Sequence, residues 1–353
     1  MNTRTAEGIA QAARTAVEAA LWAPSIHNTQ PWTFGVSGDE ICLRADPDRK
    51  LRVSDPTGRQ MTISCGAALL NVRVTLQALG YDPQVRRFPD PERPLLLATV
   101  RVRPGREPGE HTRLLHAEIE RRRTHRSGFT ALPVPDPLVE ALVTEAAAED
   151  GHLMPIRSEV SARVLAALTG AAQDVQSQDR LFVLELMRWA RPPGSSRRDG
   201  VPAAGYPTDP RRTQPQHFAP RDYARGHEWG MAPDERVSAS TGLVALLTTA
   251  GDRREDWAAR GRGAAADAAA RLRVRPERRV PHPGAGDAGV AGVHPQAPVL
   301  GRGAADDHAA GVRHRRERER PPRRLRRDGL TPRRRRRQGT LDAWREIVNI
   351  ADT

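Results

Sequence analysis

The sequence predicts a fold of mixed helices and strands, and three features of its first eighty residues indicate this. Apolar residues recur at helical spacing within 5–23. Two β-rich runs, 32–36 and 40–43, flank a Ser-Gly-Asp turn and predict a hairpin. A second apolar helix is expected over 60–79, where Gly80 can cap its end. The chain therefore begins as helix, hairpin and helix.

The body of the chain continues in the same mixed pattern. A strand is expected over 95–102, and helices over 111–123, 135–148 and, in two pieces, 160–190. Residues 192–225 are rich in Pro, Arg and Gly and predict a long loop, which in a compact domain is usually functional or mobile. The run Leu-Val-Ala-Leu-Leu-Thr-Thr at 243–249 predicts a buried strand.

Length and composition narrow the class of protein. A chain of 353 residues can form two or three domains or one two-lobed unit. Cys42 and Cys65 have no metal or redox spacing, so we expect two reduced, packed thiols and no metal site. Residues 1–14 lack the apolar core of a signal peptide. No apolar run approaches the roughly 18–20 residues that span a bilayer, so the expectation is a soluble cytoplasmic protein without a membrane segment.

Positive charge is concentrated at the end of the chain. The sequence has 56 Lys plus Arg against 43 Asp plus Glu, and Lys50 is its only lysine, which we attribute to the codon bias of a GC-rich genome. Residues 258–353 contain 23 Arg and 11 acidic residues, a net charge of +12 out of +13 for the whole chain. Any argument for nucleic-acid binding from charge therefore concerns this tail alone.

A first polar constellation occupies 23–32, between the first helix and the first strand. A loop there can present Ser25, Asn28 and backbone groups to a flat polar ring such as an isoalloxazine, whose edge alternates donors and acceptors. The alternative is an ordinary turn in which Pro and Asn serve backbone shape. Composition alone favours the turn.

The segment nevertheless resembles the A-P-S-x-x-N-x-Q-P-W signature of the flavin-dependent nitroreductases. It is most similar to their Acg-like branch, where I-H-N-T-Q-P-W is typical, and the match spans ten residues. The resemblance implies that Pro24, Ser25, Ile26 (through its backbone) and Asn28 contact the ring of FMN. Gln30, Pro31 and Trp32 would hold the loop and begin the strand.

A second constellation is the Arg-Arg-Arg-Thr-His-Arg run at 121–126. Clustered guanidiniums beside a hydroxyl suit a phosphate monoester, although a solvated basic helix end is the alternative. The run resembles the R-R-S-x-R-x-F element that opens the nitroreductase domain. The resemblance implies that Arg122, Arg123, Thr124 and Arg126 hold the FMN phosphate, with Thr124 where serine is usual.

The order of the two constellations is reversed relative to a typical nitroreductase chain. The resemblance therefore implies an α+β fold in which sheets flanked by helices form two related halves, an internal pseudo-dimer. The halves would be 1–110 and 111–257, the second incomplete, with one flavin site because 151–156 does not match the loop signature. A monomer or a weak homodimer is expected.

Three further features have smaller implications. Asp-Gly-Val-Pro at 199–202 resembles an Acg-like segment, and either a turn or part of a lid over the flavin is expected there. His27 is expected to be structural rather than a proton donor, because flavin hydride transfer needs no protein acid. The small residues at 64–68 suggest close packing near a cofactor or the other half.

The resemblance stops at Trp257. Residues 258–338 contain no Phe, Tyr, Trp, Ile or Met, so we expect disorder over the tail, 258–353. A frameshift near codon 258 would explain the change, and translation of the other frames should then restore an apolar helix. The alternative is a basic arm that binds nucleic acid, which the lack of lysine and aromatic residues disfavours.

The function that these observations favour is an FMN-binding, NAD(P)H-dependent oxidoreductase. Hydride would pass through flavin N5 to a small acceptor such as a nitro compound or quinone. The flavin supplies the chemistry, so no catalytic side chain is predicted. The alternatives are a flavin-sequestering protein with little turnover and a nucleic-acid-binding protein acting through the tail.

Overall fold

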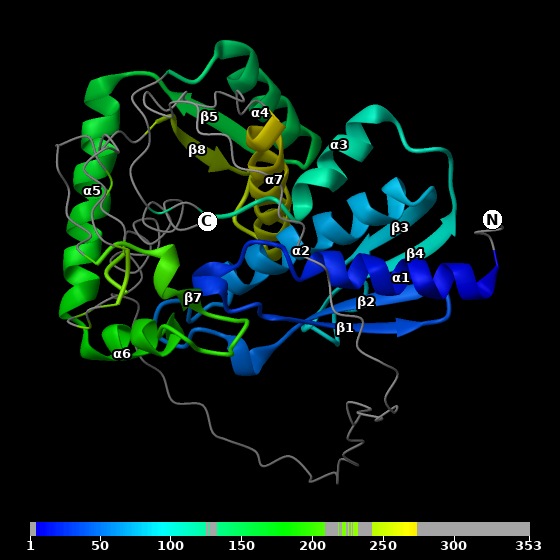
Figure 1. The fold of residues 1–353 in the computed structure, drawn as a ribbon, viewed down its shortest axis with the longest axis horizontal. Coiled ribbons are helices and arrows are strands. Elements are labelled where there is room, and N and C mark those ends of the chain that lie inside the picture. The colour runs from blue at the N-terminus through cyan, green and yellow to red at the C-terminus, as the bar shows by residue number, and fades with distance from the viewer. Residues whose placement is uncertain are drawn as a thin grey trace, which may run out of the picture. The chain divides into compact units, whose positions relative to one another are not determined.

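The first part of the chain builds a four-stranded antiparallel sheet with helices on one face (Figure 1). The computed structural model describes residues 5–124, 126, 133–208, 218, 221–223, 225, 227, 229–231 and 242–273, all within one structural unit. The strands are β1 (Trp32–Ser37), β2 (Glu40–Ala45), β3 (Tyr81–Arg87) and β4 (Leu96–Pro104), in the order β1-β2-β4-β3. The predicted hairpin is β1–β2, with Trp32 opposite Ala45.

Helices α1 (Ala6–Ala20) and α2 (Arg59–Ala78) pack together over this sheet. The hydroxyl of Thr5 accepts the backbone N–H of Gly8 and caps α1, whose alanine face is buried. The carboxylate of Asp55 accepts the N–H of Met61 at 2.9 Å and caps α2. Both helices confirm the predicted apolar spacing.

The second part of the chain is mainly helical. Helices α3 (Glu110–Ile119), α4 (Asp136–Ala148), α5 (Glu159–Gln178) and α6 (Arg180–Trp189) confirm the predicted positions, including the division into two pieces. Strands β5 (His152–Ile156) and β8 (Val244–Thr248) form a two-stranded antiparallel sheet. Strand β6 (Ala190–Arg191) follows α6 directly and pairs in parallel with β7 (Val201–Pro202), which lies in the expected long loop and is followed there by η3 (Ala203–Gly205).

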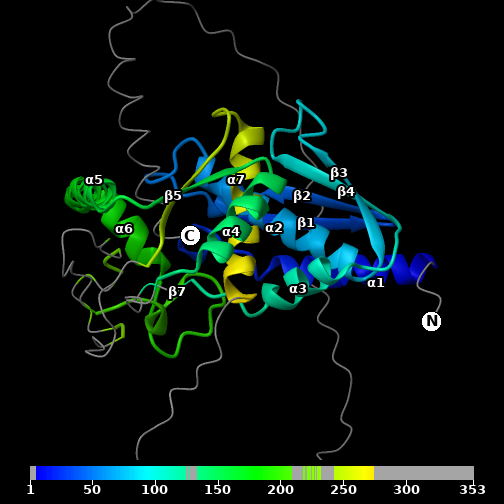
Figure 2. The same cartoon turned by 90° about the horizontal axis from the view of Figure 1, so that it is seen from above.

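Helix α7 (Arg254–Arg273) corrects the expectation that disorder begins at residue 258. It packs against α2 and α4 (Figure 2). A Cβ atom on Gly261 or Gly66 would overlap the backbone of the facing helix, so the two glycines allow a close approach. Ala265 and Ala266 join the main core. The composition of this segment wrongly suggested disorder. Small residues stabilise a fold by allowing backbones to pack closely rather than by side-chain volume, and alanine favours helix.

The mixed helix-and-sheet architecture confirms the α+β class, whereas the relation of the halves as a pseudo-dimer stays a prediction. Residues 274–353 lie outside the described part of the chain. Within the described residues, no helix is both long and apolar enough to cross a bilayer. Cys42 and Cys65 are both free thiols, as expected.

Candidate functional site

The loop at 24–30 leaves α1 and is largely buried, including Ser25, Ile26 and His27. Residues 26–28 form a single 3-10 turn, η1. His27, Asn28 and Gln30 have positive φ values of 49°, 52° and 48°. Non-glycine residues rarely adopt this conformation, so the surrounding structure must hold it in place.

Hydrogen bonds from within the protein fix the shape of this loop. The Ser25 hydroxyl accepts the N–H of Gln30 at 3.0 Å. The Ser64 hydroxyl, on α2, accepts the N–H of Ile26 at 3.2 Å. Ser64, the first of the small residues at 64–68 that were expected to pack closely, therefore holds the loop in place.

The Asp-Gly-Val-Pro segment lies directly against Asn28. The Asn28 side-chain nitrogen donates to the carbonyl of Gly200 at 2.9 Å, and the N–H of Gly200 donates back to the Asn28 carbonyl at 2.9 Å. Gly200 has a φ of 79°, which only glycine adopts without strain. The segment thus behaves as a turn that clamps the loop.

An ion pair strengthens this clamp. Arg49 donates from Nη1 to both the Thr29 carbonyl and the Asp199 carboxylate, each at 2.9 Å. Partial burial alone would raise the pKa of Asp199, but hydrogen bonds from Arg197 and Arg49 outweigh it and lower that pKa. The loop is therefore anchored on both sides.

The basic run approaches the start of the same loop. Arg122 donates from Nη2 to the Trp22 carbonyl at 3.1 Å and from Nη1 to the Thr124 hydroxyl at 3.2 Å. Arg123 is exposed, and its guanidinium lies over the Trp22 ring with 5.0 Å to the centroid. Arg126 lies over the Tyr223 ring at 5.8 Å.

Two arginines of the basic run, Arg122 and Arg126, carry positive charge without a carboxylate partner in the described part of the chain. Among the described residues, no ion pair to Arg122 or Arg126 is formed, and the Nε atom of each is buried without a hydrogen-bond partner. Burial, followed by the charges of Arg123 and Arg126, lowers the pKa of Arg122 to about 10. Arginines whose charge is held in this way favour the binding of an anion.

His27 connects the loop to a pair of buried tyrosines. Its Nδ1 lies 2.7 Å from the Tyr223 hydroxyl, and the Tyr206 ring lies 5.4 Å from that of Tyr223. Burial, then the charges of Arg221 and Arg126, lower the pKa of His27 well below its usual value. His27 is thus a buried neutral side chain, in line with the structural role expected for it.

Two links connect the predicted basic run to the region of the predicted loop. Arg122 donates to the carbonyl of Trp22, two residues before the loop, and Arg126 lies over Tyr223, whose hydroxyl contacts His27 of the loop. His125 and 127–129 lie outside the described residues. Tyr206 and Tyr223 were not predicted as part of the site, although two of the three tyrosines of the chain fall in the long loop, and this was an available signal.

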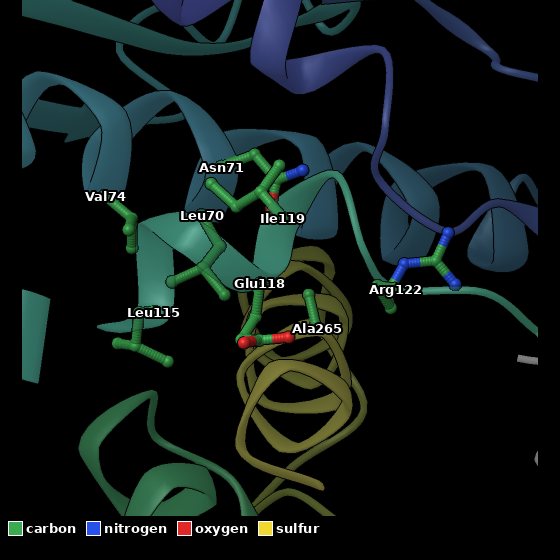
Figure 3. Close-up of a pocket in the computed structure, with 8 residues that line it drawn as sticks. All are labelled: Leu70, Asn71, Val74, Leu115, Glu118, Ile119, Arg122 and Ala265. Carbon is green, nitrogen blue, oxygen red and sulfur yellow. The ribbon is translucent and has the colours of Figure 1, made fainter. Parts of the chain in front are cut away.

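A small cavity beside Arg122 is lined by residues of α2, α3 and α7 (Figure 3). It contains about 10 Å³ of free volume, enough for one water molecule and far too little for a flavin. In Figure 3, the guanidinium of Arg122 points away from Glu118 and Ala265 of the cavity wall. We therefore do not place the cofactor in this cavity. In the described part of the chain, no cluster of His, Cys, Asp or Glu could hold a metal ion.

No model of a protein family matches the chain. Curated relatives come from Mycobacterium tuberculosis. "Putative NAD(P)H nitroreductase Rv3131" is 39% identical over 213 residues, 60% of this chain and 59% of the relative. "Putative NAD(P)H nitroreductase acg" is 34% identical over 176 residues, 50% of this chain and 53% of the relative.

"Uncharacterized protein Rv3127" from the same organism is 31% identical over 183 residues, 51% of this chain and 53% of the relative. The chain thus spans only between about half and three fifths of the length of these relatives. The resemblance inferred from the loop and the basic run is confirmed at this level: over that segment, the chain resembles nitroreductases of the Acg-like branch.

Proposed function

We propose that this chain is an NAD(P)H-dependent oxidoreductase of the nitroreductase type that binds FMN. The loop residues Pro24, Ser25, Ile26 and Asn28 would face the flavin ring. Arg122, Arg123, Thr124 and Arg126 would hold its phosphate. The names given to the relatives support the reaction class, and the geometry of the basic run supports the cofactor.

The uncompensated charge of Arg122 and Arg126 carries this proposal. Both side chains keep a buried Nε without a partner, and no carboxylate of the described residues pairs with them. A phosphate monoester would supply negative charge and acceptor oxygens at once, and guanidinium–phosphate hydrogen bonds are among the strongest in proteins. The residues therefore fit the phosphate end of FMN.

The loop fits the ring in a different way. The Ser25 hydroxyl, the Ile26 N–H and the Asn28 amide nitrogen already have protein partners. We therefore expect the loop to offer a rigid, mostly apolar surface, with its shape rather than its donors selecting a flat ring. When bound, FMN would accept hydride from NAD(P)H and deliver it to a nitro compound, quinone or similar acceptor.

The test compares two flavins on the full chain. FMN and riboflavin share the ring, and only FMN has the phosphate. We expect FMN to bind about 10- to 150-fold more tightly, the equivalent of ~1.5–3 kcal/mol for hydrogen bonds to a charged group. Equal affinities, measured by fluorescence quenching, would contradict a phosphate role for the basic run.

The same complex distinguishes an enzyme from a flavin store. NADPH added without oxygen should bleach the flavin absorption band of an oxidoreductase. The loop is covered by the Asp-Gly-Val-Pro turn and by α6, and this cover favours sequestration as the second candidate. A tightly bound flavin that NADPH and NADH both leave oxidised would select that candidate.

A further inference from the structure

A carboxylate of α6 occupies an unusual position in a loop more than 130 residues earlier in the chain. Glu185 accepts the N–H groups of Arg52 at 2.6 Å and Val53 at 3.1 Å through Oε1. Its Oε2 accepts the N–H of Ser54 at 2.9 Å and the Ser54 hydroxyl at 2.5 Å. Three successive backbone N–H groups and one hydroxyl therefore converge on one anionic group.

Such a concave arrangement of successive N–H groups is a nest, the kind of backbone feature that binds phosphate in many proteins. A carboxylate offers two oxygens to these four donors. A phosphate offers three oxygens and more negative charge. The donor set at 52–54 is therefore at least as suitable for a phosphate as for Glu185.

The shape of this nest is maintained by bonds that do not involve Glu185. The Asp55 N–H donates to the Leu51 carbonyl at 3.2 Å, and the Gly58 N–H donates to the Asp55 carbonyl at 3.1 Å. Lys50 donates from Nζ to the Pro56 carbonyl at 2.7 Å. We therefore expect the nest to persist when the carboxylate leaves.

Glu185 also lies on the helix that covers the candidate flavin loop. Phe182 and Leu186, on either side of it in sequence, pack with Val53. Trp189 packs with Ile26 of the loop and with Leu51. The carboxylate therefore fastens α6 at the point where its apolar face meets both the nest and the loop.

We propose that residues 52–54 form a second anion site, a nest for the phosphate group of a small ligand, which Glu185 fills in the ligand-free chain. A phosphate that enters displaces Glu185 and loosens α6 from Ile26. The site is separate from the basic run at 121–126. The proposal does not depend on whether the chain binds FMN.

Removal of the internal anion tests this directly. The Glu185→Ala variant should unfold at a lower temperature than the unaltered chain in chloride. Inorganic phosphate should raise its unfolding temperature saturably, and by more than it raises that of the unaltered chain, where Glu185 competes. Chloride at matched ionic strength measures general screening. Any phosphate bound at Arg122 and Arg126 contributes to both proteins and cancels in the comparison.

Two variants serve as controls. Glu159→Ala removes the same charge from an exposed position on α5 and should respond to phosphate as the unaltered chain does. Adding Ser54→Ala to Glu185→Ala should weaken the phosphate response, because one of the four donors is lost. A Glu185→Ala response no larger than that of Glu159→Ala overturns the proposal.

A second measurement needs no variant and covers the case in which Glu185→Ala does not fold. Hydrogen exchange of the unaltered chain is followed in phosphate and in chloride. Amides of α6 should exchange faster when phosphate saturates the nest, and those of α2 should not. Unchanged exchange of α6 at phosphate concentrations that stabilise the protein also overturns the proposal.

Discussion

Two groups of buried or half-buried arginines in this chain are built in opposite ways. Arg262 on α7 is 4% exposed and donates to Glu149 at 2.9 Å and Asp150 at 3.0 Å, while Arg73 on α2 pairs with the same Glu149. Within the described residues, Arg122 of the basic run donates to a carbonyl and a hydroxyl and to no carboxylate. Burial lowers the pKa of both Arg262 and Arg122, yet only for Arg262 does a carboxylate act in the other direction.

The contrast separates a structural use of arginine from a binding use. In the first group, the charges are neutralised inside the fold and join α2, α4 and α7. In the second, positive charge is held near the loop without neutralisation, which is costly unless a ligand supplies the anion. Removal of charge should therefore destabilise the fold at the first group and weaken ligand binding at the second.

The largest expected effect is at Glu149. Glu149→Ala leaves Arg262 and Arg73 without their shared carboxylate, and breaking a buried pair in this way costs about 3–5 kcal/mol of unfolding free energy. Urea unfolding measures it. Asp136→Ala, which removes an exposed partner of Arg157, is the control and should cost no more than about 1 kcal/mol. Equal losses of unfolding free energy in the two variants would contradict a structural role for the Glu149 ion pairs.

At the second group, removal of an arginine should weaken ligand binding rather than lower the stability of the fold. Arg122→Met should weaken FMN about 10- to 150-fold, or ~1.5–3 kcal/mol, and leave riboflavin nearly unaffected. The flavin-free variant should unfold at a temperature close to that of the unaltered chain, because no carboxylate loses its partner. Arg113→Met, at an exposed helix position, is the control. If Arg122→Met instead unfolds as early as Glu149→Ala, the basic run is structural.

The position of Arg262 depends on the close contact of α7 with α2. Gly261→Ala places a methyl group against the Ile63 carbonyl, so the helices must separate, at a cost of about 1–3 kcal/mol as for other overpacked sites. Thermal unfolding measures this. Gly109→Ala, where an added Cβ meets nothing within 4 Å, is the matched change. A Gly261→Ala variant as stable as Gly109→Ala would show that α7 does not dock through this glycine.

The smallest effect is a pH dependence at His27. Its pKa is lower in the folded chain than the usual 6.5, so below about pH 6.5 the unfolded state takes up the proton first. Stability therefore falls with decreasing pH, by at most about 1.4 kcal/mol per pH unit, until the folded-state pKa is passed.

His27→Gln should remove this slope, whereas His111→Gln, at an exposed position, should not. Bound FMN should shorten the pH range over which stability falls in the unaltered chain, since its phosphate would offset the charge of Arg126, a smaller cause of the lowered pKa of His27 than burial. Chemical denaturation at several pH values measures both. Parallel slopes for His27→Gln and the unaltered chain would show that burial does not control this group.

Local patterns predicted most helices and the first hairpin, because spacing alone sets which face is buried. Strand β3 was not predicted, because it contains Pro83 and is mostly polar. An edge strand tolerates both features. Helix α7 was missed because its packing depends on Gly66 of another helix. Neither signal is visible within one short window of sequence.

The candidate site likewise has parts that the sequence could indicate and parts that it could not. The loop and the basic run are contiguous motifs, so the sequence could indicate both and the resemblance could relate them. The hydrogen bond between His27 and Tyr223 joins residues 196 positions apart, and Glu185 accepts a hydrogen bond from Ser54, 131 positions earlier. Such pairs arise from tertiary packing and leave no periodic trace in the sequence.

The docking of α7 also bears on how the protein is produced for experiments. A recombinant chain cut at Trp257 would lose Arg262 together with Ala265 and Ala266 of the main core. The buried alanine and leucine surface of α2 would then face solvent, and such chains tend to aggregate during expression. A chain that ends at residue 275 retains all of α7, so it is the sounder starting point for crystallisation trials.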